Sequence, residues 1–301
     1  MNFFLKKYNL FTIPFLIIIT LTFCKSERKE SSVESELINI EVDTTSVFLK
    51  YQSTVFSLPS PHQVSVILKM NEVSYNPKLI NDEQNFSRYS TTMRKALNLG
   101  IYGTDLGYLN IYNRTEEAIT YYLIVDKLAK ELEISQAVDE ATLRKIEANL
   151  SHNDSILSII SSTYKDIDQY LSANNREAVG ILILAGGWLE SLYLSTQTLL
   201  DNYSKNLVKH ITKQKYPLEK LIRLMAPYYD QSKEFSELID QFTDLAYEFD
   251  CIDIFYNYKE PKVYPDKKLT VINSQTELNL NNYNLAKISK KVEEIRNKIT
   301  D

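Results

Sequence analysis

The sequence predicts an all-α protein, a compact bundle of about eight to nine helices around two central ones. Two long apolar stretches support this prediction: residues 178–200 hold one charge, Glu190, and residues 96–113 hold one charge, Asp105. A helix that is apolar on every side is normally surrounded by other helices. Over residues 235–256, apolar side chains alternate spacings of three and four, which predicts a helix with a heptad seam. No long segment alternates apolar and polar residues as a half-buried strand does.

All six glycines of the chain lie in the two apolar stretches. Gly100, Gly103 and Gly107 share one helix face, and Gly180 and Gly187 share a face of the other helix. A glycine inside a helix costs about 1 kcal/mol relative to alanine. We therefore expect these rows to mark a close crossing of two helices. A groove over bare backbone is the alternative.

The N-terminus combines positive charge with a short apolar run. Lys6 and Lys7 precede the apolar residues 11–23. This run has the length of a signal peptide and is shorter than the ~18–20 residues that a membrane-spanning helix needs. We therefore expect residues 1–23 to be a signal peptide.

Leu21, Thr22, Phe23 and Cys24 resemble the lipobox of bacterial lipoproteins, with leucine three positions before the cysteine. The resemblance implies that the sulfur of Cys24 is modified with fatty acids such as palmitate and that the signal is cleaved just before it. Phe23 departs from the family, in which a small residue is usual at that position. An uncleaved N-terminal anchor, with Cys24 as an incidental apolar residue, is the alternative.

The segment that follows differs in composition from the rest of the chain. Residues 24–45 are rich in serine, glutamate and lysine, so we expect a flexible tether. Residues 46–301 are expected to form a single helical domain. Its first part, residues 46–58, is weakly strand-like and ends at Pro59. The helices expected beyond it span residues 61–73, 86–113, 115–133, 139–150, 153–171, 175–210, 217–228, 231–258 and 275–299.

A solenoid of helical hairpins is the alternative architecture. Residues 106–107, 117–118 and 121–122 resemble fragments of a tetratricopeptide repeat. No second copy appears at the ~34-residue period of that repeat, so the compact bundle is favoured. Residues 269–272 are expected to form a short extended piece between the last two helices. Cys251, beside the heptad seam, is expected to be a small buried apolar residue.

Composition and motifs exclude several classes of function. The net charge of −5 and the pI near 5.5 argue against a nucleic-acid-binding protein, which should present a basic patch. His62, His152 and His210 lack a second histidine or an acid at metal-ligand spacing, so no metal site is expected. The sequence has no Walker or dinucleotide-binding glycine loop and no Gly-x-Ser-x-Gly elbow, so no cofactor is expected either.

The two lone acids mark the candidate site. A carboxylate in apolar surroundings needs hydrogen bonds or a cation, because otherwise burial raises its pKa. One interpretation is that Asp105 and Glu190 are satisfied core carboxylates. The other is that they line a polar pocket for a small ligand between the central helices. The candidate lining residues are Asp105, Glu190, Tyr102, Tyr108, Tyr112, Trp188 and Tyr193.

Three classes of function remain open. Residues 98–108 resemble uncharacterised all-helical lipoproteins of Bacteroidetes-type bacteria, a resemblance that implies no known activity. Lys25, directly after Cys24, is not the acidic retention signal known from enteric bacteria, so we expect a domain held at the outer membrane by lipid on Cys24, with periplasmic or surface exposure open. We expect a non-enzymatic binding or scaffolding protein whose partner is a protein or a small polar ligand. An envelope enzyme that uses Asp105 and Glu190 as a carboxylate pair is the alternative. A third class is an integral membrane protein in which residues 179–200 span the bilayer, with Glu190 costing about 2.5–3.5 kcal/mol.

Overall fold

The computed structural model describes most of the chain beyond residue 72 and short pieces before it. The described residues are 46–51, 54–59, 67–69, 73–137, 144–145, 159, 163, 166–167, 169–201 and 203–301. Residues 43–301 form one compact unit. Most of the predicted helices 61–73, 139–150 and 153–171 lies outside the described residues, as do Cys24 and the N-terminal segments. The few described residues of the latter two helices are helical. The described α-helices are α2 (Thr92–Ile111), α3 (Thr115–Glu131), α6 (Glu177–Asp201), α7 (Lys205–Lys213), α8 (Lys215–Met225), α9 (Lys233–Asp250) and α10 (Asn282–Thr300).

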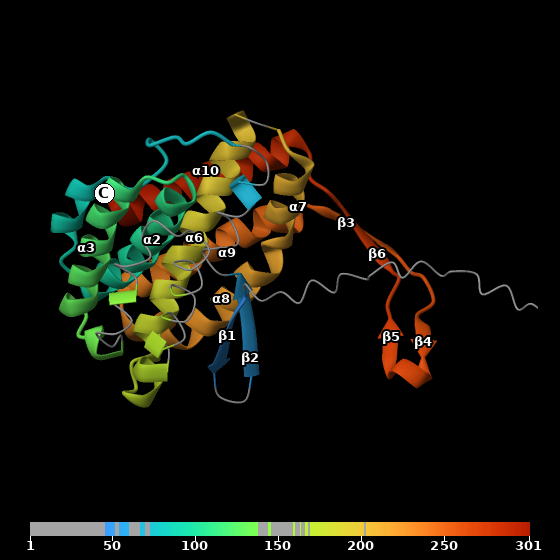
Figure 1. Cartoon of the computed structure of the whole chain (residues 1–301), viewed down its shortest axis with the longest axis horizontal. Helices are drawn as coiled ribbons and strands as arrows, with labels where there is room; N and C mark the ends of the chain where they lie inside the picture. The colour runs from blue at the N-terminus through green and yellow to red at the C-terminus, as the bar shows by residue number, and fades with distance from the viewer. Residues whose placement is uncertain are drawn as a thin grey trace, which may run out of the picture. The chain divides into compact units, whose positions relative to one another are not determined.

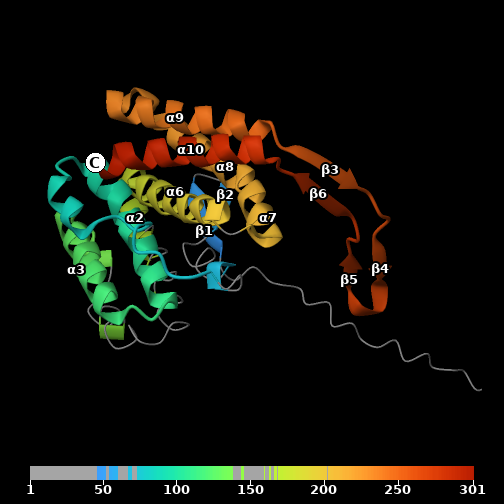
Figure 2. The same ribbon diagram turned by 90° about the horizontal axis from the view of Figure 1, so that it is seen from above.

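The fold is all-α and multi-helical, as the sequence predicted (Figure 1). Helices α2 and α6 occupy its interior: every residue from Ala96 to Ile111 and from Val179 to Thr196 is buried. Helix α3 packs against α2, α10 packs against α6, and α9 packs against α10 (Figure 2). Helix α6 is long and apolar enough to span a membrane, but most of it is buried inside the domain.

Helices α2 and α6 cross so closely that backbone touches backbone. A Cβ atom on Gly100 would lie 2.0 Å from the carbonyl oxygen of Ile183, and one on Gly186 would lie 2.0 Å from that of Leu97. Both distances are far below van der Waals contact, so only glycine fits at either position. The hydroxyl of Thr104 donates a hydrogen bond across the crossing to the carbonyl oxygen of Gly187 (3.2 Å). The expected close crossing is therefore confirmed, with Gly100 from the predicted row on α2. On α6 the residue that cannot carry a Cβ is Gly186, which lies outside the predicted row of Gly180 and Gly187, and Gly187 contributes its backbone nitrogen opposite Gly100.

Helix boundaries follow local capping. The side chains of Thr91, Ser204, Ser232 and Asn281 each accept a hydrogen bond from a backbone N–H in the first turn of α2, α7, α9 and α10. Ser204 explains why the helix predicted over 175–210 is interrupted between α6 and α7. The helix predicted over 86–113 is likewise divided, because the 3₁₀ helix η1 (Glu83–Arg88) precedes α2. Short 3₁₀ helices also follow α3 and α8: η2 (Ser135–Ala137) and η3 (Ala226–Gln231).

The region between α9 and α10 corrects the prediction. Helix α9 ends at Asp250, and the chain continues as strand β3 (Asp253–Asn257), which pairs antiparallel with β6 (Gln275–Asn279). Strands β4 (Lys262–Tyr264) and β5 (Leu269–Val271) pair at the far end, on either side of the 3₁₀ helix η4 (Pro265–Lys267). These four strands form a β arm that extends away from the helices (Figures 1 and 2).

Two predictions in this region are wrong for a physical reason. The seam spacing continues to Tyr256, but Ile254, Phe255 and Tyr256 have high strand propensity and leave the helix. Tyr256 is 62% exposed as a result. Cys251 is exposed at the end of α9, and not buried as expected. The short extended piece expected near 269–272 is confirmed as β5, and residues 46–58 form the antiparallel hairpin of β1 (Ser46–Tyr51) and β2 (Thr54–Pro59).

Substituting a crossing glycine tests the contact between the two central helices. Gly100→Ala or Gly186→Ala is expected to destabilise the protein by about 3 kcal/mol, because overpacking forces the two backbones apart. Alanine would otherwise favour a helix by about 1 kcal/mol over glycine. The sign of the change in thermal unfolding temperature is therefore decisive, and an unchanged or raised value for either variant would contradict the close crossing.

Candidate functional site

The structure brings the two lone acids together in the core and gives one of them a cation. Glu190 and Asp105 are both fully buried, on α6 and α2. Arg296, from α10, forms a two-bond ion pair with Glu190: Nε lies 2.7 Å from Oε2, and Nη2 lies 2.9 Å from Oε1. Such paired geometry is the strongest that arginine makes with a carboxylate. The negative charge of Glu190 is therefore compensated inside the protein.

The surroundings of Arg296 hold it in one position. Its Nη2 also donates to the carbonyl oxygen of Leu79 (3.2 Å), and its guanidinium lies 4.3 Å from the ring centre of Tyr193. Burial alone would lower the pKa of Arg296, but the charge of Glu190 and the hydrogen bonds to it outweigh burial and raise the pKa. Arg296 therefore stays charged in the core.

Asp105 is bound less completely than Glu190. Its Oδ2 accepts a hydrogen bond from the backbone N–H of Asn81 (3.0 Å), whereas its Oδ1 has no hydrogen-bond partner. Burial raises the pKa of Asp105 well above its ordinary value, and the neighbouring charge of Glu190 raises it further. Arg296 and the N–H of Asn81 act in the opposite direction. The net effect shifts Asp105 toward its neutral, protonated form, which avoids two adjacent buried anions.

The last turn of α10 is fixed to the rest of the core by side chains. The final carbonyl groups of a helix have no partner within the helix. Here Arg94 donates to the carbonyl oxygen of Lys298 (3.1 Å), Asn98 donates to that of Ile299 (3.0 Å), and Tyr89 donates to that of Thr300 (3.2 Å). These bonds fix the position of the helical turn that carries Arg296.

The tyrosines of α2 and α3 face the irregular segment 73–82. Burial raises the pKa of Tyr102 and of Tyr108, and the charge of the nearby Asp105 raises both further. Tyrosine hydroxyl groups bond to backbone groups of this segment, which itself forms no helix or strand. The hydrogen bonds run from Tyr102 to the carbonyl oxygen of Asp82 (2.7 Å), from Tyr112 to that of Val73 (2.7 Å), from Tyr121 to that of Asn81 (2.6 Å), and from the N–H of Asn76 to Tyr108 (3.0 Å).

Trp188 belongs to a different cluster. Its indole N–H donates to Oε1 of Gln214 (3.0 Å), and its ring meets that of Phe242 edge-on at 5.7 Å. Nε2 of Gln214 lies 3.2 Å from Nε2 of His210, which is buried. Burial, with a smaller contribution from the charge of Lys213, lowers the pKa of His210 to about 4. The imidazole is therefore neutral at pH 7.

The candidate residues thus divide into three groups. Asp105, Glu190 and Tyr193 lie around Arg296. Tyr102, Tyr108 and Tyr112 instead fix segment 73–82, and Trp188 lies with Gln214. Sequence reasoning missed Arg296, although one signal was present: it lies four residues after Val292 and three before Ile299, on the apolar stripe that α10 buries.

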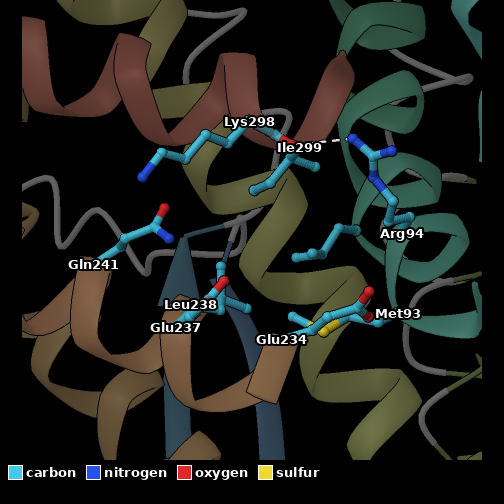
Figure 3. A pocket seen from close by; sticks show the side chains of 9 residues that line it. Met93, Arg94, Glu234, Glu237, Leu238, Gln241, Lys298 and Ile299 are labelled. Atoms are coloured by element: carbon cyan, nitrogen blue, oxygen red, sulfur yellow. Dashed lines mark hydrogen bonds between the residues drawn. The ribbon is translucent and has the colours of Figure 1, made fainter. Parts of the chain in front are cut away.

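Two described cavities lie away from the buried acids. One, of about 340 Å³, lies where α2, α9 and α10 meet (Figure 3). The other, of about 310 Å³, lies at the turn between α2 and α3, around Arg114 and Glu117. Neither touches Asp105 or Glu190. Within the part of the chain that the structure describes, no three His, Cys, Asp or Glu side chains are placed to hold a metal ion.

Paired substitutions of the two acids separate their roles. Glu190→Gln is expected to cost about 3–5 kcal/mol, because it leaves the buried Arg296 without its counter-charge. Asp105→Asn is expected to stabilise the protein relative to the wild type, and the gain should grow with pH.

The folded protein holds a proton on Asp105 that the unfolded chain releases, so this group's contribution to the stability of the wild type falls as the pH rises above 3.8. Asparagine carries no titrating proton, so the variant has no such loss. Urea unfolding at pH 5 and pH 8 checks both effects. A gain for Asp105→Asn that did not grow with pH would refute the shifted pKa.

His210 predicts a second pH dependence. The unfolded chain binds a proton near pH 6.5, whereas the folded protein binds it only near pH 4, so stability falls as the pH drops through this window. Between pH 7 and pH 5 the loss from this group is about 2 kcal/mol. His210→Gln keeps a hydrogen-bonding side chain but cannot be protonated, so it should remove that part of the loss. Equal acid sensitivity of the two proteins in urea unfolding would show that the folded protein accommodates a charged His210.

Similarity to known proteins does not assign this cluster a role. No known family model, no curated protein and no solved structure matches the chain. The function of the chain therefore has to be argued from the side chains that it buries and exposes.

Proposed function

We propose that the protein is a lipoprotein of the bacterial cell envelope, held at the outer membrane by lipid on Cys24, with a helical domain that binds other molecules. The anchor is supported by the sequence of residues 1–24, which combines a positive start, an apolar run and a lipobox-like end. Fatty acids on one cysteine supply about 0.8 kcal/mol per buried methylene. Residues 24–45 would then separate the helical domain from the membrane surface.

The state of the buried acids favours binding over catalysis. An acid and a base that act on a substrate must come within about 3 Å of it. Asp105 and Glu190 are near each other, but both are fully buried and Glu190 is engaged by Arg296. A substrate could reach them only if the elements that bury them moved. Their arrangement is that of core carboxylates that the protein satisfies internally.

The exposed apolar side chains of the β arm support a binding role. The arm exposes large apolar side chains that a domain without partners would have little reason to keep in water. An isolated two-stranded ribbon is also marginally stable by itself. The exposed side chains on the arm are Phe255, Tyr256, Tyr258, Val263, Tyr264 and Ile272. A partner protein that covered these side chains would stabilise both the arm and the complex.

The membrane-spanning alternative has less support. Only α6 among the described helices has the required length and apolarity, and it is enclosed by other helices. Placing it in a bilayer would also remove Glu190 from Arg296. We therefore favour a lipid anchor at Cys24 over a span at α6.

The two cysteines of the chain provide a matched test of the anchor. In bacterial cells fed an alkyne analogue of palmitate, the wild type and Cys251→Ala are expected to incorporate the label, and Cys24→Ala is not. The exposed Cys251 controls for any cysteine that becomes acylated without a signal. Mass spectrometry should find the wild-type chain beginning at a modified Cys24. An unlabelled wild type, or equal labelling of Cys24→Ala, would overturn the proposed anchor.

A further inference from the structure

The larger cavity has walls of opposite charge that do not meet. Glu234 and Glu237, from the first turns of α9, lie along one side, and Arg94 of α2 and Lys298 of α10 lie along the other, with the guanidinium of Arg94 and the ammonium of Lys298 at opposite ends of the cavity (Figure 3). No hydrogen bond or ion pair between described residues joins the two sides. A space of about 340 Å³ lies between the two sides. Glu234, Glu237 and Lys298 are exposed to solvent and Arg94 is half-buried, so that a ligand from solution can reach all four charges.

The charged groups also lack strong partners elsewhere. Among the described residues, the carboxylate of Glu234 and the ammonium of Lys298 have no ion pair. Glu237 has only an exposed contact with Lys233 at 3.5 Å, a kind of pair that contributes about 0–1 kcal/mol. Arg94 uses one Nη2 bond to hold the carbonyl oxygen of Lys298, which leaves its other N–H groups available.

Between the charged sides the cavity is apolar. Leu97, Leu238 and Ile299 are buried residues that form its floor, and Met93 lines it at one end. Gln241 stands in the same wall as the two glutamates, and its Oε1 has no hydrogen-bond partner. A rotation of this carboxamide would turn the oxygen toward a ligand amine. The volume falls at the lower end of the range for small-molecule sites, about 300–1,000 Å³.

We propose that this cavity binds a short peptide, of two or three residues, with free termini and apolar side chains. The ammonium group would lie against Glu234 and Glu237, the carboxylate against Arg94, and the side chains on the apolar floor. The exposed side chain of Lys298 would have to turn toward Arg94 to contact the same carboxylate. A peptide carries its two charges at opposite ends, as two separated walls require, whereas a single amino acid carries both on one carbon. Arginine is well suited to the carboxylate, because its planar donors match two oxygens. This inference rests on the proposed binding role of the helical domain but not on the lipid anchor.

Four ligands test the match of charges. Isothermal titration calorimetry on the full chain in detergent would use Leu-Leu, N-acetyl-Leu-Leu, Leu-Leu-amide and leucine. Leu-Leu is expected to bind, and blocking either terminus should weaken binding about tenfold or more, because one charged wall is then left unpaired. Leucine should bind more weakly than Leu-Leu. Equal binding of Leu-Leu and both blocked peptides, or no binding of Leu-Leu, would overturn the proposal.

Variants of the two walls identify the contacts. Glu234→Gln should lose the preference for Leu-Leu over its acetylated form, and Lys298→Met should reduce the preference over the amide. Glu294→Gln and Lys290→Met are matched controls, because these residues form an exposed pair on α10 outside the cavity. The controls should bind as the wild type does, and an equal effect of wall and control variants would overturn the proposal. Lost peptide binding with intact palmitate labelling would refute this site alone and leave the anchor standing.

Discussion

The core depends on the backbone contacts between α2 and α6, in which Gly100 faces Ile183 and Gly187 and Gly186 faces Leu97. At this crossing no side chain separates α2 from α6, so the residues just beyond it are forced together. Asp105 follows the crossing on α2, and Glu190 follows it on α6. Two carboxyl groups in one apolar core cannot both be ionised without a large cost in free energy. The close crossing thus creates an electrostatic problem that another part of the chain has to solve.

Helix α10 supplies the cation that neutralises Glu190, and α2 holds α10 in place. Arg296 neutralises Glu190, while the side chains of Arg94 and Asn98 on α2 bind the carbonyl groups that end α10. The ion pair and the bonds to the helix end therefore support each other: a shift of α10 would break both at once. A buried ion pair adds little net stability compared with apolar packing, but it penalises every arrangement that separates its partners. Its contribution here is to specify how α10 lies on α2 and α6.

The sequence predicted what is encoded locally and missed what depends on tertiary contacts. The central helices were predictable because residues 178–200 and 96–113 are apolar on all sides, and their glycines indicated a close contact. The partner of Glu190 was not predictable by spacing, because Arg296 lies more than a hundred positions away. The β arm was missed for a different reason: the seam of α9 continues in spacing through Tyr256, whereas strand propensity ends the helix before it. The tyrosines were placed on the correct helix, but their hydrogen-bond partners lie in an irregular segment that has no pattern of its own.

The charged groups of the core differ from those around the larger cavity in whether they have partners within the protein. In the core, every strong charge is brought to a partner: Glu190 meets Arg296, and Asp105 shifts toward its neutral form. At the junction of α2, α9 and α10, charges of opposite sign face each other across open space and stay unpaired. The first arrangement is complete without a ligand, since any added group would have to displace existing bonds. The second can accept the proposed ligand at little cost, because Glu234 and Lys298 are exposed and would gain partners there without breaking any ion pair that the described structure contains.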